Sequence, residues 1–314
     1  MTRSDLSDTV FVYGALRSGT TLLNLMLNGH PAIHNPGEVD PLLDFIAPDP
    51  DHPTGWRYDR ARMEGHRLFR ALGIALPDGA DGLDLFEAMI GALRAKSDKP
   101  VLSLTVHRNA GRLKRILPEA RILHLLRDPR DVARSAVGMG WAGNSYVAVG
   151  GWIETETEWD RAGFDADRVM TLKFEDLLAD PEASLDRVAR FHGMAYDPAM
   201  LDYPRTSTYG PPDPKTAQQW RRKARPREIG LIEARIGPMM TARGYPPEHP
   251  RPLPGPAEET LLRAQHRIAR WGYNIRRFGL PLFLGRHLAR RTGLGALERR
   301  LAARQDEIII RNQK

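Results

Sequence analysis

The chain has 314 residues, of which 41% are hydrophobic and 27% are charged, a composition typical of a folded globular protein. It contains no cysteine, which excludes disulfides, iron–sulfur clusters, thiolate zinc sites and a cysteine nucleophile. No apolar run approaches the roughly 18 residues that span a bilayer, and the first residues show no signal-peptide pattern. We therefore expect a cytoplasmic protein.

The formal net charge of +7 is unevenly distributed along the chain. Residues 1–250 carry 32 basic and 34 acidic side chains, whereas residues 251–314 carry 14 basic and 5 acidic ones. A proline-rich stretch separates the two parts and is typical of a semi-rigid linker. We predict a nearly neutral main domain over residues 1–244, a linker over 245–256 and a basic, amphipathic helical tail over 257–314.

Short apolar runs alternate with longer helical patterns in the main domain, which indicates an α/β fold with a central parallel sheet. The predicted strands are residues 9–13, 101–105, 121–126 and 168–174. Residues 40–98, between the first two strands, have a mainly helical pattern and include a clear amphipathic helix over 83–94. We expect this insertion to form part of a substrate-binding mouth.

The loop after the first strand has the features of a phosphate-binding loop. It reads Gly14-Ala-Leu-Arg17-Ser18-Gly19-Thr20-Thr21 and leads into an amphipathic helix. Its glycines allow successive N–H groups and the helix N-terminus to face one anion. The spacing matches the nucleotide-triphosphate loop G-x-x-x-x-G-K-[ST], but Thr20 stands at the lysine position. The loop therefore predicts phosphate binding, with Arg17 as its cation.

The third predicted strand ends at Arg127, where a second anion-binding group is expected. Asp128 is a favourable N-cap and Pro129 a favourable first helical residue, so a helix should begin here. Ligands of α/β sheets bind at the carboxyl ends of the strands, so Arg127 should lie near the loop and bind a second phosphate together with Ser135. An Asp128–Mg²⁺ contact, as in a P-loop kinase that uses ATP, is the alternative.

These motifs resemble those of the sulfotransferases that use 3′-phosphoadenosine-5′-phosphosulfate (PAPS), specifically the bacterial and tyrosylprotein branch. The resemblance covers most of residues 9–244 and implies a P-loop-like three-layer fold. It implies that the loop holds the 5′-phosphosulfate and that the arginine and serine eight residues apart hold the 3′-phosphate. Phe174, which stands in place of the family's tyrosine, would lie near the adenine. Trp220 and Arg221 would belong to a closing basic loop. The donor-binding residues implied are Arg17, Ser18, Gly19, Thr20, Thr21, Arg127, Ser135, Phe174, Trp220 and Arg221.

The resemblance also implies sulfuryl transfer to a hydroxyl acceptor without a metal. Arg17 would stabilise the leaving phosphate oxygen, and Glu38, 21 residues further on, resembles the general base of the tyrosylprotein branch. His34 and His107 are alternative bases, because the cytosolic branch uses histidine. Many relatives have a lysine where this chain has Leu104, so a second cation would have to come from Arg108 or His107.

The acceptor and the partner of the tail stay open at this stage. Four aromatic residues of the 138–160 segment suggest an apolar mouth, although such residues are more often part of a core: Trp141, Tyr146, Trp152 and Trp159. The tail shows an apolar stripe from Leu261 to Leu282 that one helix would explain, and we expect it to pack on the domain, to form a homodimer contact or to contact a membrane surface. No motif for nucleic-acid binding accompanies its charge. A P-loop kinase and a non-catalytic family member are the alternatives to a sulfotransferase.

Overall fold

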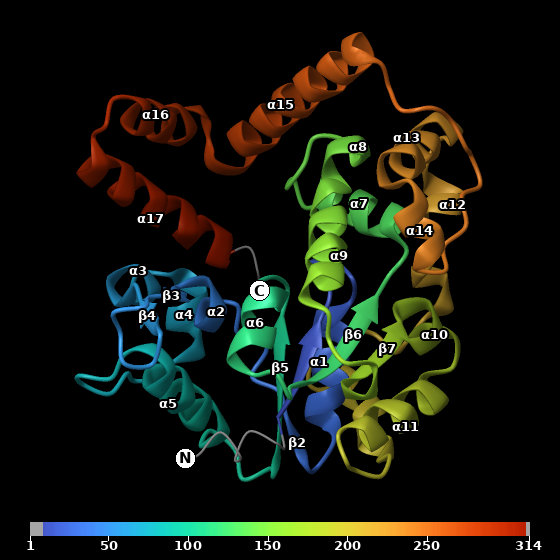
Figure 1. Ribbon diagram of the computed structural model, residues 1–314. Coiled ribbons are helices and arrows are strands. Elements are labelled where there is room, and N and C mark those ends of the chain that lie inside the picture. The colour runs from blue at the N-terminus through green and yellow to red at the C-terminus, as the bar shows by residue number, and fades with distance from the viewer. Residues whose placement is uncertain (1–8, 312–314) are drawn as a thin grey trace.

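A parallel five-stranded sheet forms the centre of the protein in the computed structural model, which describes residues 9–311 (Figure 1). The strand order is β2-β5-β1-β6-β7, so the first long strand lies in the middle. The five strands are β1 (Thr9–Tyr13), β2 (Ile33–His34), β5 (Val101–Val106), β6 (Arg121–Leu126) and β7 (Val169–Lys173).

The predicted strands are confirmed to within one residue at each end. The strand predicted over 168–174 is shorter on both sides, because residues 166–168 form a 3-10 turn and Phe174 is the first residue of α10. The α/β class and the parallel sheet are confirmed as well. All five residues of β1 are buried and four of them are apolar or aromatic, because both faces of a parallel sheet are covered.

Alternating side chains of β1 build the two cores of the three-layer arrangement. Phe11 and Tyr13 join the core that contains β5 and α5, whereas Val10 and Val12 join the core that contains α1, α10 and α11. This separation follows from the period of two along a strand. The helices of the α/β domain are α1 (Thr20–Gly29), α2 (Pro41–Asp44), α3 (Arg60–Glu64), α4 (Arg67–Leu72), α5 (Gly82–Arg94), α6 (Ala110–Ile116), α7 (Pro129–Gly138), α8 (Ser145–Ala148), α9 (Gly150–Ala162), α10 (Phe174–Ala179), α11 (Pro181–Phe191), α12 (Trp220–Lys223), α13 (Pro226–Ile236) and α14 (Pro238–Ala242).

The insertion between the first two predicted strands is only partly helical. Besides α2, α3, α4 and α5 it contains an antiparallel hairpin of β3 (Ile46–Pro48) and β4 (Trp56–Tyr58). Trp56 and Tyr58 are buried on either side of an exposed residue, and the hydroxyl of Tyr58 donates to the carbonyl of Leu42 at 2.6 Å. Strand alternation over three residues is too short to stand out in a helical pattern.

The tail consists of three helices, so the expectation of one continuous helix through Leu282 is wrong. The helices are α15 (Pro256–Phe278), α16 (Leu280–Arg291) and α17 (Gly295–Arg311), which form an arm above the α/β domain in Figure 1. The break falls at Gly279, whose φ of 79° is accessible to glycine, and Pro281 then favours a new helix start. No helix among residues 9–311 combines the length and apolarity needed to cross a bilayer.

A buried charge network joins the start of α7 to the C-terminal part of the domain. Arg130 is 2% exposed; its guanidinium donates to both carboxylate oxygens of Asp128 and to Glu233 at 2.8 Å. The same guanidinium stacks 3.6 Å from the centre of the Trp220 ring. Because all of these groups are withdrawn from water, loss of the cation would leave two carboxylates uncompensated.

We expect Arg130→Met to lower the free energy of unfolding by about 3–5 kcal/mol, since it leaves Asp128 and Glu233 buried without their partner. Arg190→Met is the matched control, because Arg190 pairs with Asp186 at 2.8 Å on the exposed surface and should cost less than about 1 kcal/mol. Urea unfolding of both variants measures the difference. Equal decreases in the free energy of unfolding of the two variants would contradict a stabilising role of the buried network beyond that of a surface ion pair.

Candidate functional site

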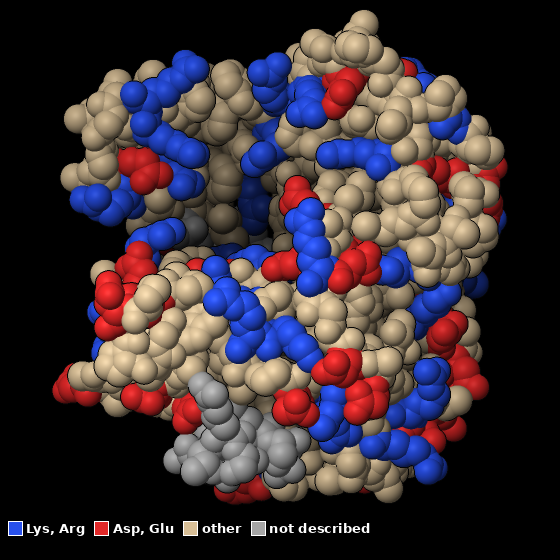
Figure 2. Space-filling view, in the orientation of Figure 1, with Lys and Arg blue, Asp and Glu red and all other residues tan. Residues whose placement is uncertain are grey.

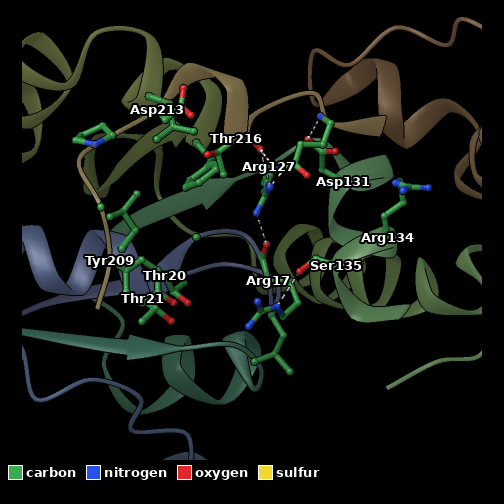
Figure 3. A pocket seen from close by; sticks show the side chains of 18 of the residues that line it. Arg17, Thr20, Thr21, Arg127, Asp131, Arg134, Ser135, Tyr209, Asp213 and Thr216 are labelled. Atoms are coloured by element: carbon green, nitrogen blue, oxygen red, sulfur yellow. Dashed lines mark hydrogen bonds and ion pairs between the residues drawn. The ribbon is translucent and has the colours of Figure 1, made fainter. Parts of the chain in front are cut away.

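A cavity of about 950 Å³ lies at the carboxyl ends of β1, β6 and β7, where the sequence analysis placed the anion site (Figure 3). Its walls come from the loop between β1 and α1, from α7, from the first residue of α10 and from the segment 209–223. The polar side chains on these walls are Arg17, Thr20, Thr21, Glu38, Arg127, Asp131, Arg134, Ser135, Asp213, Thr216, Gln219 and Lys223.

The loop between β1 and α1 has the backbone geometry of an anion cradle. Gly19 is the N-cap of α1 with a φ of 99°, and among the described residues no side chain caps this helix end. The first N–H groups of α1 therefore remain available to a ligand. A Cβ at Gly19 would lie 2.2 Å from the ring of Phe174, so only glycine fits between the loop and that ring. Arg17 also has a positive φ, of 74°.

Arg127 connects three walls of the cavity. Its guanidinium donates to the carbonyl of Arg17 at 3.1 Å and to the carbonyl of Thr216 at 3.3 Å. It also lies 4.4 Å from the ring centre of Phe174. Figure 3 shows this side chain between the loop and the 209–223 segment. Arg127 therefore reaches the cavity, as predicted, and also holds the phosphate-binding loop in place.

Ser135 lines the same cavity, and its side chain contacts Arg17 rather than Arg127. Its hydroxyl accepts a hydrogen bond from Nε of Arg17 at 3.0 Å, and the guanidinium of Arg17 lies 5.6 Å from the ring centre of Trp141. The serine thus orients the loop cation, while Arg127 approaches from the neighbouring strand. Both arginines and the serine still surround one space (Figure 3).

Two buried donors in or next to the cavity wall have no hydrogen-bond partner within residues 9–311. The hydroxyl of Ser18 and Nε of Arg127 are buried and make no hydrogen bond there. Burial lowers the pKa of Arg127, against the opposing effect of the nearby Asp131 carboxylate. Unsatisfied buried donors are costly, and an anion would satisfy them. The donor set therefore fits a ligand that carries more than one phosphate or sulfate group.

Glu38 lies on the cavity wall with His107 behind it. Backbone pairing with Thr105 holds Glu38 beside the end of β5, and its Oε1 is 3.3 Å from Nε2 of His107. Nδ1 of His107 lies 2.8 Å from the carbonyl oxygen of Gly14, so Nδ1 carries a proton because a carbonyl can only accept. The side chain of Glu38 is 36% exposed and that of His107 only 1%. Glu38 is therefore the group that a ligand can reach.

The pair shifts the acid–base equilibria of both groups. The close approach of His107 lowers the pKa of Glu38 and outweighs the burial that would raise it. Burial by itself lowers the pKa of His107, but the nearby carboxylates of Glu38 and Asp40 outweigh it, so the pKa of His107 is raised. Glu38 is thus held as a carboxylate beside a histidine that favours its protonated form.

The other candidates for base and second cation do not line this cavity. His34 lies in β2 and burial lowers its pKa. Arg108 donates to both carboxylate oxygens of Asp44, at 2.7 and 2.5 Å. The additional cations on the cavity wall are instead Arg134 and Lys223. Neither stood out in the sequence beyond its position near the predicted motifs.

One cluster in the described residues has a spacing that a metal ion could accept. Ligand atoms of Glu38, Asp40 and His107 lie within 4.8 Å of one another. The pairing of His107 with Glu38 already uses two of these groups, and Oδ1 of Asp40 accepts the backbone N–H of His107 at 2.8 Å. The Mg²⁺ alternative at Asp128 has less support, because its oxygens accept from Arg130 and from Nε1 of Trp220 and the residue does not line the cavity.

Three predicted donor-binding residues lie outside the cavity wall: Ser18, Trp220 and Arg221. Ser18 is 1% exposed within the loop. Trp220 is 1% exposed and packs on Arg130, whereas Arg221 forms an exposed ion pair with Glu248. Neighbouring positions of the same segment do reach the cavity, including Tyr209, Thr216, Gln219 and Lys223.

Of the aromatic residues expected at an acceptor mouth, only Trp141 lines the cavity, and it is 43% exposed. Tyr146 and Trp152 are buried in the domain, and Trp159 stacks 3.9 Å from the ring of His124. No residue of the 40–98 insertion belongs to the cavity lining, which differs from the expectation for that segment.

Comparison with known proteins shows the family to which the chain belongs. The model of the sulfotransferase family matches residues 9–198. Among curated proteins, protein-tyrosine sulfotransferase 2 of Gallus gallus is 23% identical over 84% of this chain and 76% of its own length. Among solved structures, the sulfotransferase domain of the Synechococcus PCC 7002 olefin synthase is similar with a TM-score of 0.55. It is 21% identical over 76% of this chain and 95% of that domain.

A second solved structure, the sulfotransferase domain from the curacin biosynthetic pathway, has a TM-score of 0.54 and 16% identity over 78% of this chain and 98% of that domain. Structural likeness at such identities concerns the fold, while the family model covers more than half of the chain. The chain therefore belongs to the sulfotransferase family, the PAPS-dependent enzymes that its loop motifs predicted.

Proposed function

We propose that the protein transfers the sulfuryl group of PAPS to a hydroxyl acceptor in the cavity between Arg17 and Glu38. Two groups that line one cavity support the proposal. The first is the uncapped start of α1 together with Arg17 and Arg127. The second is the carboxylate of Glu38, which the buried His107 keeps ionised. The first set suits an anionic donor and the second suits removal of a proton from an alcohol or phenol.

The donor would be held by the loop and by the ends of two strands. The N–H groups and hydroxyls at Thr20 and Thr21 suit the 5′-phosphosulfate, and Arg127 with Ser135 suits the 3′-phosphate. The ring of Phe174 lies next to Gly19 on the cavity wall, a position that suits contact with the adenine. Lys223 and Arg134 add positive charge to the same cavity.

The reaction would be an in-line displacement at sulfur. The acceptor oxygen forms a bond to sulfur while the bond between sulfur and the 5′-phosphate oxygen breaks, and the acceptor proton passes to a carboxylate oxygen of Glu38. Negative charge develops on the departing phosphate oxygen, and Arg17 is oriented by Ser135 to stabilise it. Adenosine 3′,5′-bisphosphate leaves as the second product.

His107 acts in this scheme as a positioning residue. Its Nδ1–H is committed to Gly14, so Nε2 can only face Glu38. The histidine thereby orients the carboxylate and keeps it ionised, so two of the three base candidates of the sequence analysis, Glu38 and His107, belong to a single arrangement. The acceptor side of the mouth contains the exposed Leu16, Trp141 and Tyr209, which suits an acceptor with an apolar part.

Replacement of the base should separate catalysis from binding. We expect Glu38→Gln to lower turnover by about 10²–10⁴-fold, the usual contribution of a general base, and to leave the affinity for adenosine 3′,5′-bisphosphate nearly unchanged. The measurement is transfer from labelled PAPS to a panel of alcohols, phenols, sugars and lipids, with calorimetry for the bisphosphate. Glu154→Gln, on the exposed side of α9, is the control. Unchanged turnover in both Glu38→Gln and Arg17→Ala would favour a non-catalytic protein.

Removal of the histidine should change the pH dependence. The close approach of His107 lowers the pKa of Glu38, so the wild-type enzyme should lose kcat/KM only below pH 4.5, the ordinary pKa of the group. His107→Gln removes the protonated partner, and the acidic limb of the kcat/KM profile should move to higher pH. His34→Gln should leave the limb in place. An unmoved limb in His107→Gln would show that the histidine has a structural role alone.

Ligand choice distinguishes the proposed enzyme from a P-loop kinase. Since Thr20 stands at the lysine position and Asp128 is committed to Arg130, we expect tight binding of adenosine 3′,5′-bisphosphate in the presence of EDTA. Isothermal titration with the bisphosphate, and separately with ATP and Mg²⁺, measures this. Tight binding of Mg²⁺–ATP without binding of the bisphosphate would overturn the assignment.

A further inference from the structure

The helical tail carries most of the exposed large hydrophobic side chains of the described chain. Eight of the thirteen lie in the tail, seven of them in α15, α16 and α17 and Leu294 in the turn before α17, although this is the most basic part of the sequence. Exposed apolar side chains that gather in one region mark a contact surface. The eight are Leu261, Ile268, Trp271, Leu280, Leu284, Leu288, Leu294 and Leu297.

One face of α15 is already occupied by the α/β domain. Leu262 is 6% exposed and its carbonyl accepts from the side chain of Asn144 at 2.7 Å, while Nδ1 of His266 accepts from the N–H of Gly143 at 3.1 Å. The ring of Tyr273, further along the same face, lies against Gly140, where an added Cβ would be 2.2 Å from the ring. These contacts fix the rotation of α15 about its own axis.

A different face of α15 carries exposed apolar side chains. Leu261 and Ile268 are seven residues apart and therefore share one side of the helix. They are 54% and 73% exposed, and their side lies roughly 100–140° around the helix from the docked Leu262 and Tyr273. The packing that fixes α15 on the domain thus presents these side chains to the surroundings.

The second tail helix repeats this arrangement. Leu280, Leu284 and Leu288 are spaced by four residues and form one exposed stripe. The other side of α16 packs on its neighbours: Ala289 is 2% exposed, and the ring of Phe283 meets Trp271 edge-on at 5.7 Å. The leucine stripe is therefore displayed by a packed helix.

Unpaired arginines accompany the apolar stripes. A groove of about 510 Å³ between the tail helices is lined by Arg267, Arg270 and Arg290 together with Trp271 and Phe283. None of the three arginines has an ion-pair partner among the side chains that the structure describes. Figure 2 shows Lys and Arg side chains along the tail and around the hollow beneath it.

We propose that the tail binds the surface of an anionic lipid bilayer, with its leucine stripes in the interface and its arginines at the lipid phosphates. Amphipathic helices that combine a basic face with Leu, Trp and Phe bind in this way, and each basic residue adds electrostatic attraction. A second copy of the chain suits the surface less well, since two tails with 14 basic and 5 acidic residues each would repel one another. This inference does not depend on the sulfuryl-transfer reaction.

Co-sedimentation of the full chain with vesicles tests the proposal. We expect binding to vesicles of equal parts phosphatidylcholine and phosphatidylglycerol, weak binding to phosphatidylcholine alone, and release by added salt. The combined variant Leu280→Glu, Leu284→Glu, Leu288→Glu should bind at least about tenfold more weakly. Leu253→Glu is the control, because Leu253 is 64% exposed in the linker outside the helices.

A second set of variants tests the charge. Arg267→Glu, Arg270→Glu, Arg290→Glu together should abolish the preference for phosphatidylglycerol, whereas the same change at Arg187, Arg190 and Arg205 of the α/β domain should not. An unchanged midpoint of thermal unfolding, followed by circular dichroism, shows that each variant is folded, and sedimentation equilibrium gives its oligomeric state.

Three outcomes would overturn the proposal: no vesicle binding, equal binding to both vesicle types, or no effect of the leucine substitutions. A wild-type dimer that those substitutions dissociate, without vesicle binding, would assign the surface to a second copy. If the wild-type protein transfers no sulfuryl group, the vesicle-binding results still test this proposal, because vesicle binding does not require that reaction.

Discussion

The contact between Arg127 and the carbonyl of Arg17 is the interaction on which the site depends. A guanidinium withdrawn from water joins the phosphate-binding loop to the end of β6, to the Phe174 ring and to the 209–223 segment. Four separate pieces of chain are thereby kept around one cavity. Because burial disfavours the charged form of Arg127, an anionic ligand would stabilise this cation as well as bind to it.

The strand order explains why acid–base and anion-binding groups meet. The loop after β1 lies in the centre, β6 on one side brings Arg127, and β5 on the other side brings Glu38 and His107. Neighbouring parallel strands place their carboxyl ends together, so groups more than 80 residues apart in sequence face the same space. The proposed chemistry requires this juxtaposition, since donor and acceptor must be held on opposite sides of the transferred group.

The positive charge of the tail is distributed differently from that of the cavity. The cations of the site are few and directed at one small space, whereas those of the tail are spread over helices whose apolar residues lie at the surface. The two regions meet at the loop 139–144, which contacts α15 and carries Trp141 beside Arg17. The tail therefore contributes to the support of the cavity mouth, whatever surface its outer face contacts.

Local sequence patterns were enough to predict β1, β6, the glycine-containing turn into α1 and the cap at Asp128, because each depends on contacts within a few residues: apolar runs, glycine conformations and a carboxylate next to free N–H groups. Gly279 and Pro281 were a local signal of the helix break as well. Only the tertiary structure decided that Glu38 meets His107, that Ser135 serves Arg17 and that Trp220 is buried on Arg130. Those pairings join residues 69 to 118 positions apart, and spacing along a chain carries no information about which distant side chains the packing of a sheet will bring together.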